Sequence, residues 1–135
     1  MRTILVTGGA GYVGSHVIPA LKSRGDHVVV FDDLSRGHRC VVEHLGVDLE
    51  IGDLEDRQSL KRLFERYQFD AILHFAGLAY VGESVLLPDR YYRINTTGTL
   101  NLVREVLDSA FGRLPPLVFS SSCAVFGVPD GLPLD

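Results

Sequence analysis

A glycine-rich turn near the start of the chain constrains the fold more than any other stretch. It reads TGGAGYVG over residues 7–14 and follows Ile4–Val6, an apolar run typical of a buried strand. Apolar residues then recur at helical spacing from Val13 to Leu21. Glycines at such a strand-to-helix junction open the dinucleotide-binding unit of a parallel α/β sheet. The sequence therefore predicts such a unit at its amino end.

Three glycines of this turn have distinct predicted roles. Gly8 can adopt the backbone angles of a tight turn, Gly11 has no side chain to keep the backbone away from a pyrophosphate, and Gly14 lets helix and strand pack closely. The first turn of the helix presents free N–H groups and the positive end of its dipole to that anion. The alternative is a glycine-rich turn that binds no ligand.

A second apolar run, residues 27–31, ends in two aspartates. Asp32 lies about 20 residues beyond the glycines, where a carboxylate accepts hydrogen bonds from the adenosine ribose hydroxyls. Asp32 and Asp33 together would repel a 2′-phosphate, which favours NAD over NADP. Arg36 and Arg39 work against this preference, because a nearby arginine accommodates that phosphate. Asp33 has an equally good alternative as a cap within a solvated loop.

The third and fourth predicted strands end in residues suited to the same ligand. Asp53 follows the strand 47–51 and either accepts from the adenine amino group, caps the next helix, or does both. Strand 70–75 leads into Ala76 and Gly77, small residues that let the chain pass close under a cofactor. His74, inside this strand, is expected to be a hydrogen-bonded core residue rather than a ligand or base.

Two further helices carry features of note. Pro19 interrupts the first helix, which we expect to end at Gly25, and it predicts a kink. A long helix is predicted from Pro88 to Ala110, and Asn95 on it points at backbone or cofactor, or else lies in a solvent-facing turn. The predicted apolar face of this long helix comprises Leu100, Val103, Val106, Leu107 and Ala110.

Three serines follow the fifth predicted strand, Leu117–Phe119. Ser120–Ser122 fall on the nicotinamide side of the crevice, or form an ordinary serine-rich turn. The alternation of strands and helices predicts an α/β fold: a Rossmann-type doubly wound parallel sheet of order 3-2-1-4-5, truncated after strand five. Residues 1–127 are expected to form the incomplete NAD-binding domain. Residues 128–135 would then begin a linker or loop toward a C-terminal substrate region.

Composition excludes several classes of function. The 135 residues are 46% apolar, enough for one domain, and a net charge of −4 without a polybasic block argues against nucleic acid as a partner. No apolar stretch is long enough to cross a membrane, and no secretory leader is predicted. Cys40 and Cys123 show neither metal-ligand spacing nor a disulfide framework. We therefore expect a cytoplasmic protein with no metal site.

Six blocks of residues occur in order along the chain: TGGAGYVGSH (7–16), FDDLSRGHR (31–39), GDL (52–54), HFAGLAYVGESV (74–85), residues 91–100 with Asn95, and FSSSCAVFG (119–127). Together they resemble the extended short-chain dehydrogenase/reductase family, and within it the UDP-glucose (UDP-galactose) 4-epimerases. The resemblance implies tightly bound NAD. It also implies a reaction that oxidises the 4-hydroxyl of a UDP-sugar to a transient ketone and returns the hydride to the other face.

Carried over residue by residue, the resemblance implies a role for each matching position. Ser122 matches the Ser or Thr that hydrogen-bonds the reacting 4-hydroxyl, whose proton must leave as the C–H bond breaks. The cofactor-binding positions are Gly8, Gly11, Tyr12, Val13, Gly14, Asp32, Asp33, Leu34, Asp53, Leu54, Phe75, Ala76, Gly77, Asn95 and Ser120.

The chain departs from the family pattern in its catalytic half. The family's base is a tyrosine in Tyr-x-x-x-Lys beyond the serine block, and none of the five tyrosines here is followed by lysine at the fourth position. Ala79 stands where many members carry a lysine. We therefore expect the chain to bind NAD without turnover.

Other interpretations of the function remain open beside the UDP-glucose 4-epimerase. The same blocks suit a UDP-arabinose 4-epimerase, a nucleotide-sugar 4,6-dehydratase or a non-catalytic dinucleotide-binding module. The resemblance also implies a homodimer formed through helices that include the long one.

Overall fold

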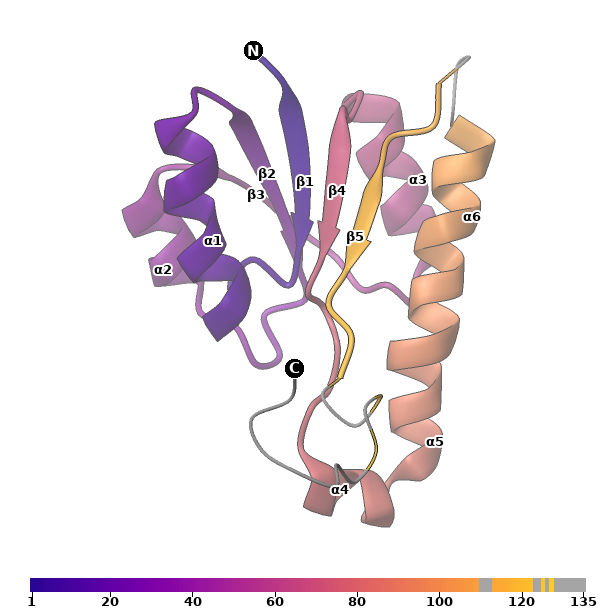
Figure 1. The fold of residues 1–135 in the computed structure, drawn as a ribbon. Helices are drawn as coiled ribbons and strands as arrows, with labels where there is room; N and C mark the ends of the chain where they lie inside the picture. The colour runs from indigo at the N-terminus through magenta and orange to yellow at the C-terminus, as the bar shows by residue number, and fades with distance from the viewer. Residues whose placement is uncertain (110–112, 123–124, 126, 128–135) are drawn as a thin grey trace.

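A five-stranded parallel sheet forms the centre of the molecule in the computed structural model, which describes residues 1–109, 113–122, 125 and 127. Its strand order is β3-β2-β1-β4-β5, as the sequence predicts (Figure 1). The elements are β1 (Thr3–Thr7), α1 (Tyr12–Ser23), β2 (His27–Asp32), α2 (Arg39–Leu45), β3 (Asp48–Ile51), α3 (Arg57–Arg66), β4 (Ala71–His74), α4 (Val81–Leu86), α5 (Pro88–Tyr91), the π-helix η1 (Tyr92–Gly98), α6 (Thr99–Ser109) and β5 (Leu117–Phe119).

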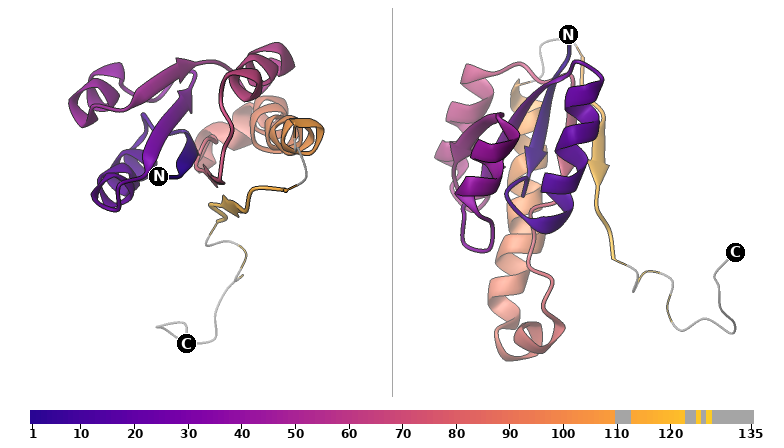
Figure 2. Two further views of the ribbon diagram at one scale, coloured as in Figure 1. Left: turned by 90° about the horizontal axis from the view of Figure 1, so that it is seen from above. Right: turned by 90° about the vertical axis from the view of Figure 1, so that its left-hand side faces the viewer.

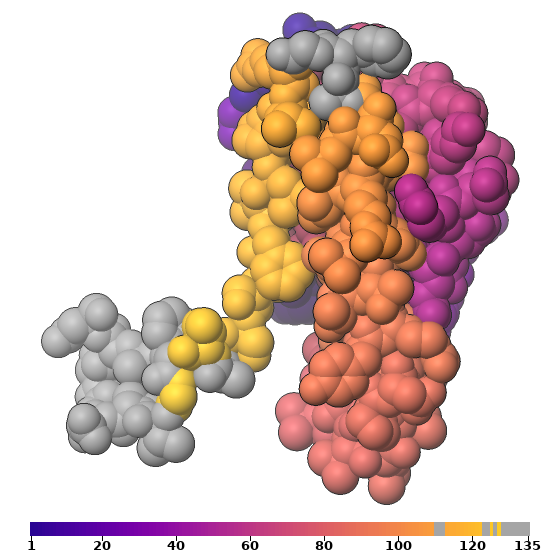
Figure 3. All heavy atoms as spheres, turned by 90° about the vertical axis from the view of Figure 1, so that its right-hand side faces the viewer, coloured from indigo at the N-terminus to yellow at the C-terminus, as the bar shows by residue number. Residues whose placement is uncertain are grey.

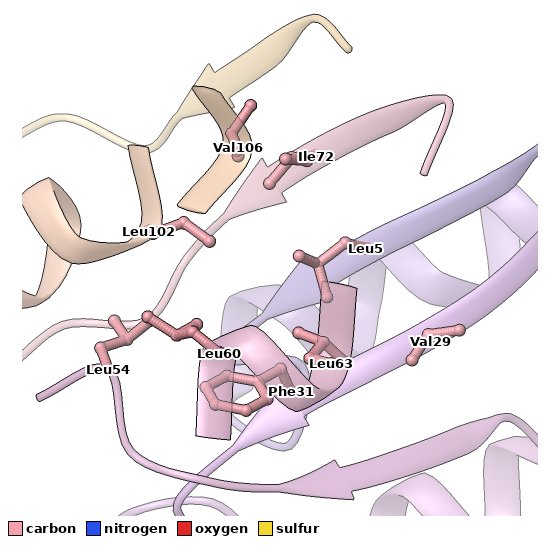
Figure 4. Packing of buried hydrophobic residues seen from close by; sticks show 9 residues of the cluster. All are labelled: Leu5, Val29, Phe31, Leu54, Leu60, Leu63, Ile72, Leu102 and Val106. Atoms are coloured by element: carbon pink, nitrogen blue, oxygen red, sulfur yellow. The ribbon is translucent and has the colours of Figure 1, made fainter. Parts of the chain in front are cut away.

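Side chains of the central strands alternate between two hydrophobic cores, one on each face of the sheet. Leu5 and Val29 belong to the core under α3 and α6, whereas Ile4 and Val28 belong to the core under α1 and α2 (Figures 1 and 2). Burial on both faces explains why these strands read as continuous apolar runs. Figure 4 shows the first core: Leu5, Val29, Phe31, Leu54, Leu60, Leu63, Ile72, Leu102 and Val106.

Helix α1 ends where the sequence predicts. Its C-cap is Arg24, and Gly25 follows in the left-handed region at φ +78°, with its N–H donating to the carbonyl of Lys22 at 2.9 Å. Pro19 lies on the exposed side of α1, and the helix continues through it. The kink predicted there stays a prediction.

Helix α3 is capped by a different aspartate from the one the sequence suggests. Asp56 is its N-cap, and the carboxylate accepts from the N–H of Gln58 at 2.9 Å. Asp53 accepts instead from the N–H of Glu55 at 2.8 Å, in the turn before the helix. The capping alternative for Asp53 is therefore wrong, because α3 begins too late for its side chain to reach the first turn.

The long helix predicted over residues 88–110 consists of three successive segments, α5, η1 and α6. The middle segment is a π-helix, whose wider turns the sequence did not predict. Gly98, in this π-helix, lies so close to the turn before α3 that a Cβ on it would be 2.9 Å from the Cβ of Leu54. Ala110 and Gly112, the predicted end of the helix, lie outside the described residues.

The apolar face predicted for this helix is wrong in part. Val106 is buried, but Leu100 and Leu107 are 49% and 56% exposed. Asn101 takes a core-facing position instead, because its side-chain amide donates to the carbonyl of Leu54 at 3.0 Å. Figure 3 shows the surface on this side of the molecule, where α6 runs alongside β5.

Two short helices were not predicted. Helix α2 begins at Arg39, and it buries Val42 in the core under α1. Helix α4 is six residues long and buries none of them. Neither is long enough to produce a clear helical repeat of apolar residues.

Candidate functional site

A cleft lies at the carboxyl ends of the strands, where parallel α/β sheets bind their ligands. Its walls come from the turns after β1, β2, β3 and β4, with one residue from η1. The structure thus brings together segments that the sequence predicted separately. The lining residues are Gly8, Gly11, Phe31, Asp32, Asp33, Ser35, Arg36, Gly37, Gly52, Asp53, Leu54, Phe75, Ala76, Gly77, Leu78 and Ile94.

The glycine turn is packed as tightly as its sequence predicts. Gly8 has φ +71°, and a Cβ there would lie 2.5 Å from the backbone nitrogen of Ala76. A Cβ on Gly14 would lie 2.5 Å from the carbonyl oxygen of Gly8, so this glycine lets α1 approach the turn. Gly11 is different, because its Cβ would meet only the Gly8 oxygen, at 3.3 Å. Gly11 therefore faces the cleft rather than the fold.

Asp32 ends β2 as a nearly buried carboxylate, 7% exposed. It accepts from the N–H groups of Ala10 at 3.0 Å and Leu34 at 2.9 Å. Burial raises the pKa of this carboxyl above its ordinary value, although the two backbone hydrogen bonds oppose the shift. Leu34 is held in the left-handed region at φ +60°, which L side chains rarely adopt.

Asp33 is exposed and caps its own loop. One carboxylate oxygen accepts from the N–H of Ser35 at 2.9 Å and from its hydroxyl at 2.8 Å. The loop-cap interpretation of Asp33 is therefore confirmed. The residue nevertheless lines the cleft beside Asp32, so its negative charge acts on any ligand there.

Asn95 supports the wall of the cleft formed by residues 75–78. Its side-chain oxygen accepts from the N–H of Leu78 at 2.8 Å, and its amide donates to the carbonyl of Leu78 at 2.9 Å. The prediction that Asn95 points at backbone is confirmed. Beneath this wall, Leu54 is buried and Asp53 is exposed at the mouth of the turn after β3.

His74 is a hydrogen-bonded core residue, as predicted, and it is 1% exposed. Its Nε2 lies 2.9 Å from the hydroxyl of Thr99, which donates to the carbonyl of Asn95 and so accepts from the ring. Nδ1 therefore accepts from the hydroxyl of Thr7, 2.6 Å away. Burial lowers the pKa of His74 to about 4.

Seven of the predicted positions do not line the cleft. Tyr12 and Val13 form the first turn of α1 and are 81% and 51% exposed, whereas Gly14 is buried under the turn. Ser120 and Ser122 follow β5 and are exposed, and the N–H of Ser120 donates to the carbonyl of His74 at 3.0 Å. Leu34 and Asn95 likewise act from behind the lining.

A second hollow lies at the opposite, amino ends of the strands, between α3 and α6. It is lined by side chains of both charges, among them Arg57, Lys61, Glu65 and Asp70, and it contains no glycine turn. Within the described ranges, no group of three or more His, Cys, Asp or Glu side chains is placed to hold a metal ion. No helix in the described part of the chain is long and apolar enough to cross a membrane.

Residues 4–135 match the sequence pattern of the NAD dependent epimerase/dehydratase family. The chain belongs to this family.

Members of the epimerase/dehydratase family from several organisms align with almost the whole chain. The UDP-glucose 4-epimerase of Rhizobium meliloti (strain 1021) is 47% identical over 134 residues, 99% of this chain and 39% of the relative. The structure of UDP-glucose 4-epimerase from Brucella ovis in complex with NAD superposes with a TM-score of 0.89 at 42% identity, over 99% of this chain and 40% of that one. An epimerase structure from Stenotrophomonas maltophila, with NAD and formylated UDP-arabinopyranose, gives a TM-score of 0.91 at 37% identity, over 99% and 41%.

The chain spans about 40% of the length of these epimerase/dehydratase relatives. The correspondence covers the whole parallel sheet and therefore includes the cleft. What lies in the remaining length of the relatives has no counterpart among residues 1–135.

Several cleft residues were not among the predicted cofactor-binding positions of this epimerase/dehydratase chain. Ser35, Arg36 and Gly37 lie in the turn after Asp32, and a Cβ on Gly37 would lie 2.6 Å from that of Ala10. The signal that could have identified them is their place in the turn after β2, which lies at the ligand-binding edge of the sheet. Ile94 had no such signal, because its position depends on the π-helix.

Proposed function

We propose that residues 1–135 form the NAD-binding part of a nucleotide-sugar epimerase that interconverts UDP-glucose and UDP-galactose. The observation that carries this proposal is the glycine turn placed beside Asp32 at the carboxyl edge of the sheet. The choice of sugar rests on the relatives, among them the UDP-glucose 4-epimerases of Rhizobium meliloti and Homo sapiens.

The glycine turn fits a pyrophosphate. Gly8 and Gly11 line the cleft, and Gly11 leaves open the space that a side chain would fill. Gly11 is the N-cap of α1 and provides no side-chain cap, so the first-turn N–H groups of Tyr12 and Val13 are available to an anion. We assign pyrophosphate binding to these residues, with Gly14 permitting the close approach of the helix.

The remaining cleft residues fit the other parts of NAD. Asp32 and Asp33 would accept from the adenine-side ribose hydroxyls, while Asp53 and Leu54 would contact the adenine. The backbone of residues 75–77, held through Asn95, would pass beneath the cofactor. When bound, NAD supplies the acceptor and donor of a hydride.

The proposed sugar-side residues follow β5 and do not line the cleft themselves. We propose that Ser120 lies beside the nicotinamide, and that Ser122 hydrogen-bonds the 4-hydroxyl whose proton leaves during oxidation. None of the five tyrosines of the chain has lysine four positions later, so residues 1–135 hold no Tyr-x-x-x-Lys base. We therefore propose that these residues bind NAD without epimerising a UDP-sugar by themselves. A cytoplasmic location and a homodimer through the helices around α6 stay predictions.

The test is calorimetric titration of the chain with NAD and then with NADP, using Gly11→Ala as the site variant. We expect saturable NAD binding to the wild-type chain and much weaker NADP binding. Gly11→Ala should lower NAD affinity by at least about tenfold, because its methyl group enters the pyrophosphate cradle, which costs a hydrogen bond or more. The variant should still fold, with a loss of stability of about 1 kcal/mol, since Gly11 is the N-cap of α1 and the methyl group meets only the Gly8 oxygen.

Gly82→Ala is the matched control. Gly82 lies on α4, nothing surrounds its Cβ position within 4 Å, and it does not line the cleft. The Gly82→Ala variant should bind NAD as the wild-type chain does. A folded wild-type chain that gives no heat with NAD would overturn the proposal, and so would a Gly11→Ala variant with wild-type affinity.

A further inference from the structure

A cluster of charged and aromatic side chains joins the loop after β2 to α4, at the rim of the cleft. Arg36 Nη2 donates to both carboxylate oxygens of Glu83, at 2.7 and 2.8 Å. The same guanidinium lies over the ring of Tyr80, 4.8 Å from its centre. These contacts link residues 47 positions apart in the chain.

Glu83 is itself fixed by Tyr91. The Tyr91 hydroxyl lies 2.8 Å from Glu83 Oε2 and 2.8 Å from the Tyr80 carbonyl oxygen, to both of which it can donate. It also accepts from the Tyr80 N–H at 3.1 Å. The hydrogen bond from Tyr91, together with the positive charges of Arg36 and Arg90, holds the pKa of Glu83 below its usual range. Glu83 is therefore an anion at neutral pH.

Arg36 belongs to the turn that would face the ribose end of a bound dinucleotide. It lines the cleft beside Asp32 and Asp33, in the turn after β2, and an arginine in that turn is the group that accommodates the 2′-phosphate of NADP. Among the described residues that line the cleft, Arg36 is the one lysine or arginine. Glu83 does not line the cleft, yet it takes both of the arginine's described hydrogen bonds.

We propose that Glu83 is a specificity-determining residue: it holds Arg36 away from the 2′-phosphate position and thereby excludes NADP. The proposal rests on the proposed function, because it assumes that the cleft binds a nicotinamide dinucleotide. With Arg36 neutralised by Glu83, a 2′-phosphate meets the negative charges of Asp32 and Asp33 without a compensating cation from the residues that line the cleft. NAD carries no phosphate there and is unaffected.

Glu83→Gln tests this inference, with NAD and NADP affinities measured by calorimetry on the 135-residue chain. Glutamine keeps the shape and the hydrogen bond from Tyr91 but removes the charge that holds Arg36. We expect NADP affinity to rise about tenfold, the size of one charge-assisted hydrogen bond, while NAD affinity stays within about twofold. Glu65→Gln on α3, at the opposite hollow, changes the net charge equally and should leave both affinities unchanged.

The double variant Glu83→Gln with Arg36→Ala assigns the effect to the arginine. If Arg36 is the group released, the second substitution returns NADP affinity to the wild-type level or below. The inference is overturned if Glu83→Gln binds NAD normally without gaining NADP affinity, or if the double variant keeps the gain. A wild-type chain that does not bind NAD instead overturns the proposed function, and the inference with it.

Discussion

Replacing Gly8 by alanine is expected to lower the free energy of unfolding by about 3 kcal/mol or more, through backbone strain and overpacking together. The Cβ would lie 2.5 Å from the nitrogen and 2.7 Å from the Cα of Ala76, and 2.7 Å from the carbonyl carbon of Phe75. These are backbone atoms that cannot rotate away, so β1 and the end of β4 must separate. Urea unfolding monitored by circular dichroism measures the loss.

Gly25→Ala is the matched control for this substitution. Gly25 has nearly the same backbone angle, φ +78° against +71° for Gly8, but nothing lies within 4 Å of its Cβ position. Its alanine variant should lose only the left-handed strain, about 1–2 kcal/mol. Equal losses in the two variants would show that the turn yields at Gly8, and would contradict the close packing of β1 against β4.

Acidification from pH 7 to pH 4 is expected to destabilise the chain by about 3 kcal/mol through His74 alone, the value that its pKa shift from 6.5 to about 4 implies. In the unfolded chain the imidazole takes up a proton near pH 6.5, whereas in the folded chain it stays neutral until about pH 4. The unfolded state therefore binds more protons between these values. Stability is fully present above pH 6.5 and declines as the pH falls toward 4.

Asp32 acts in the opposite direction, since burial raises its pKa and the folded chain binds its proton more readily. The effect of His74 is therefore best isolated by comparing variants. His74→Gln removes the titrating ring and should give a flatter dependence of unfolding free energy on pH between 6.5 and 4, although the variant is less stable overall.

The control for the histidine variant is His44→Gln, at an exposed position of α2. We expect it to keep the wild-type pH dependence. Denaturant titrations at several pH values provide the slopes. A His74→Gln variant that loses stability on acidification as steeply as the wild-type chain would contradict the assignment to His74.

The sheet and the glycine turn were predictable because their physical causes are local. Continuous apolar strands separated by helical stretches allow few parallel topologies, and the glycine turn followed by Asp32 favours the order 3-2-1-4-5 among them. The tight packing at Gly8 and Gly14 follows from the same strand-to-helix junction. The hydrogen-bonded environment of His74 was likewise predictable, since a histidine within a buried strand needs partners.

Other features depend on placement in space. Asp53 and Asp56 are equally good caps by residue type, and only the starting point of α3 decides between them. The π-helix brings Gly98 against Leu54, a contact that no local sequence pattern predicts. The pairing of Arg36 with Glu83 joins distant segments, so the sequence predicted an arginine near the phosphate position but not what holds it.

The place of β1 in the sheet has a consequence for how the chain is made. Of the five strands of the sheet, β1 is synthesised first, yet it lies at the middle of the sheet, between β2 and β4. The edge of β1 that pairs with β4 is covered only after residues 71–74 have been synthesised. The hydrogen bond between the Thr7 hydroxyl and His74 likewise joins residues 67 positions apart. Until β4 has been synthesised, a nascent chain exposes an unpaired apolar strand edge. Strands of neighbouring chains can pair with such an edge, and chaperones bind such surfaces.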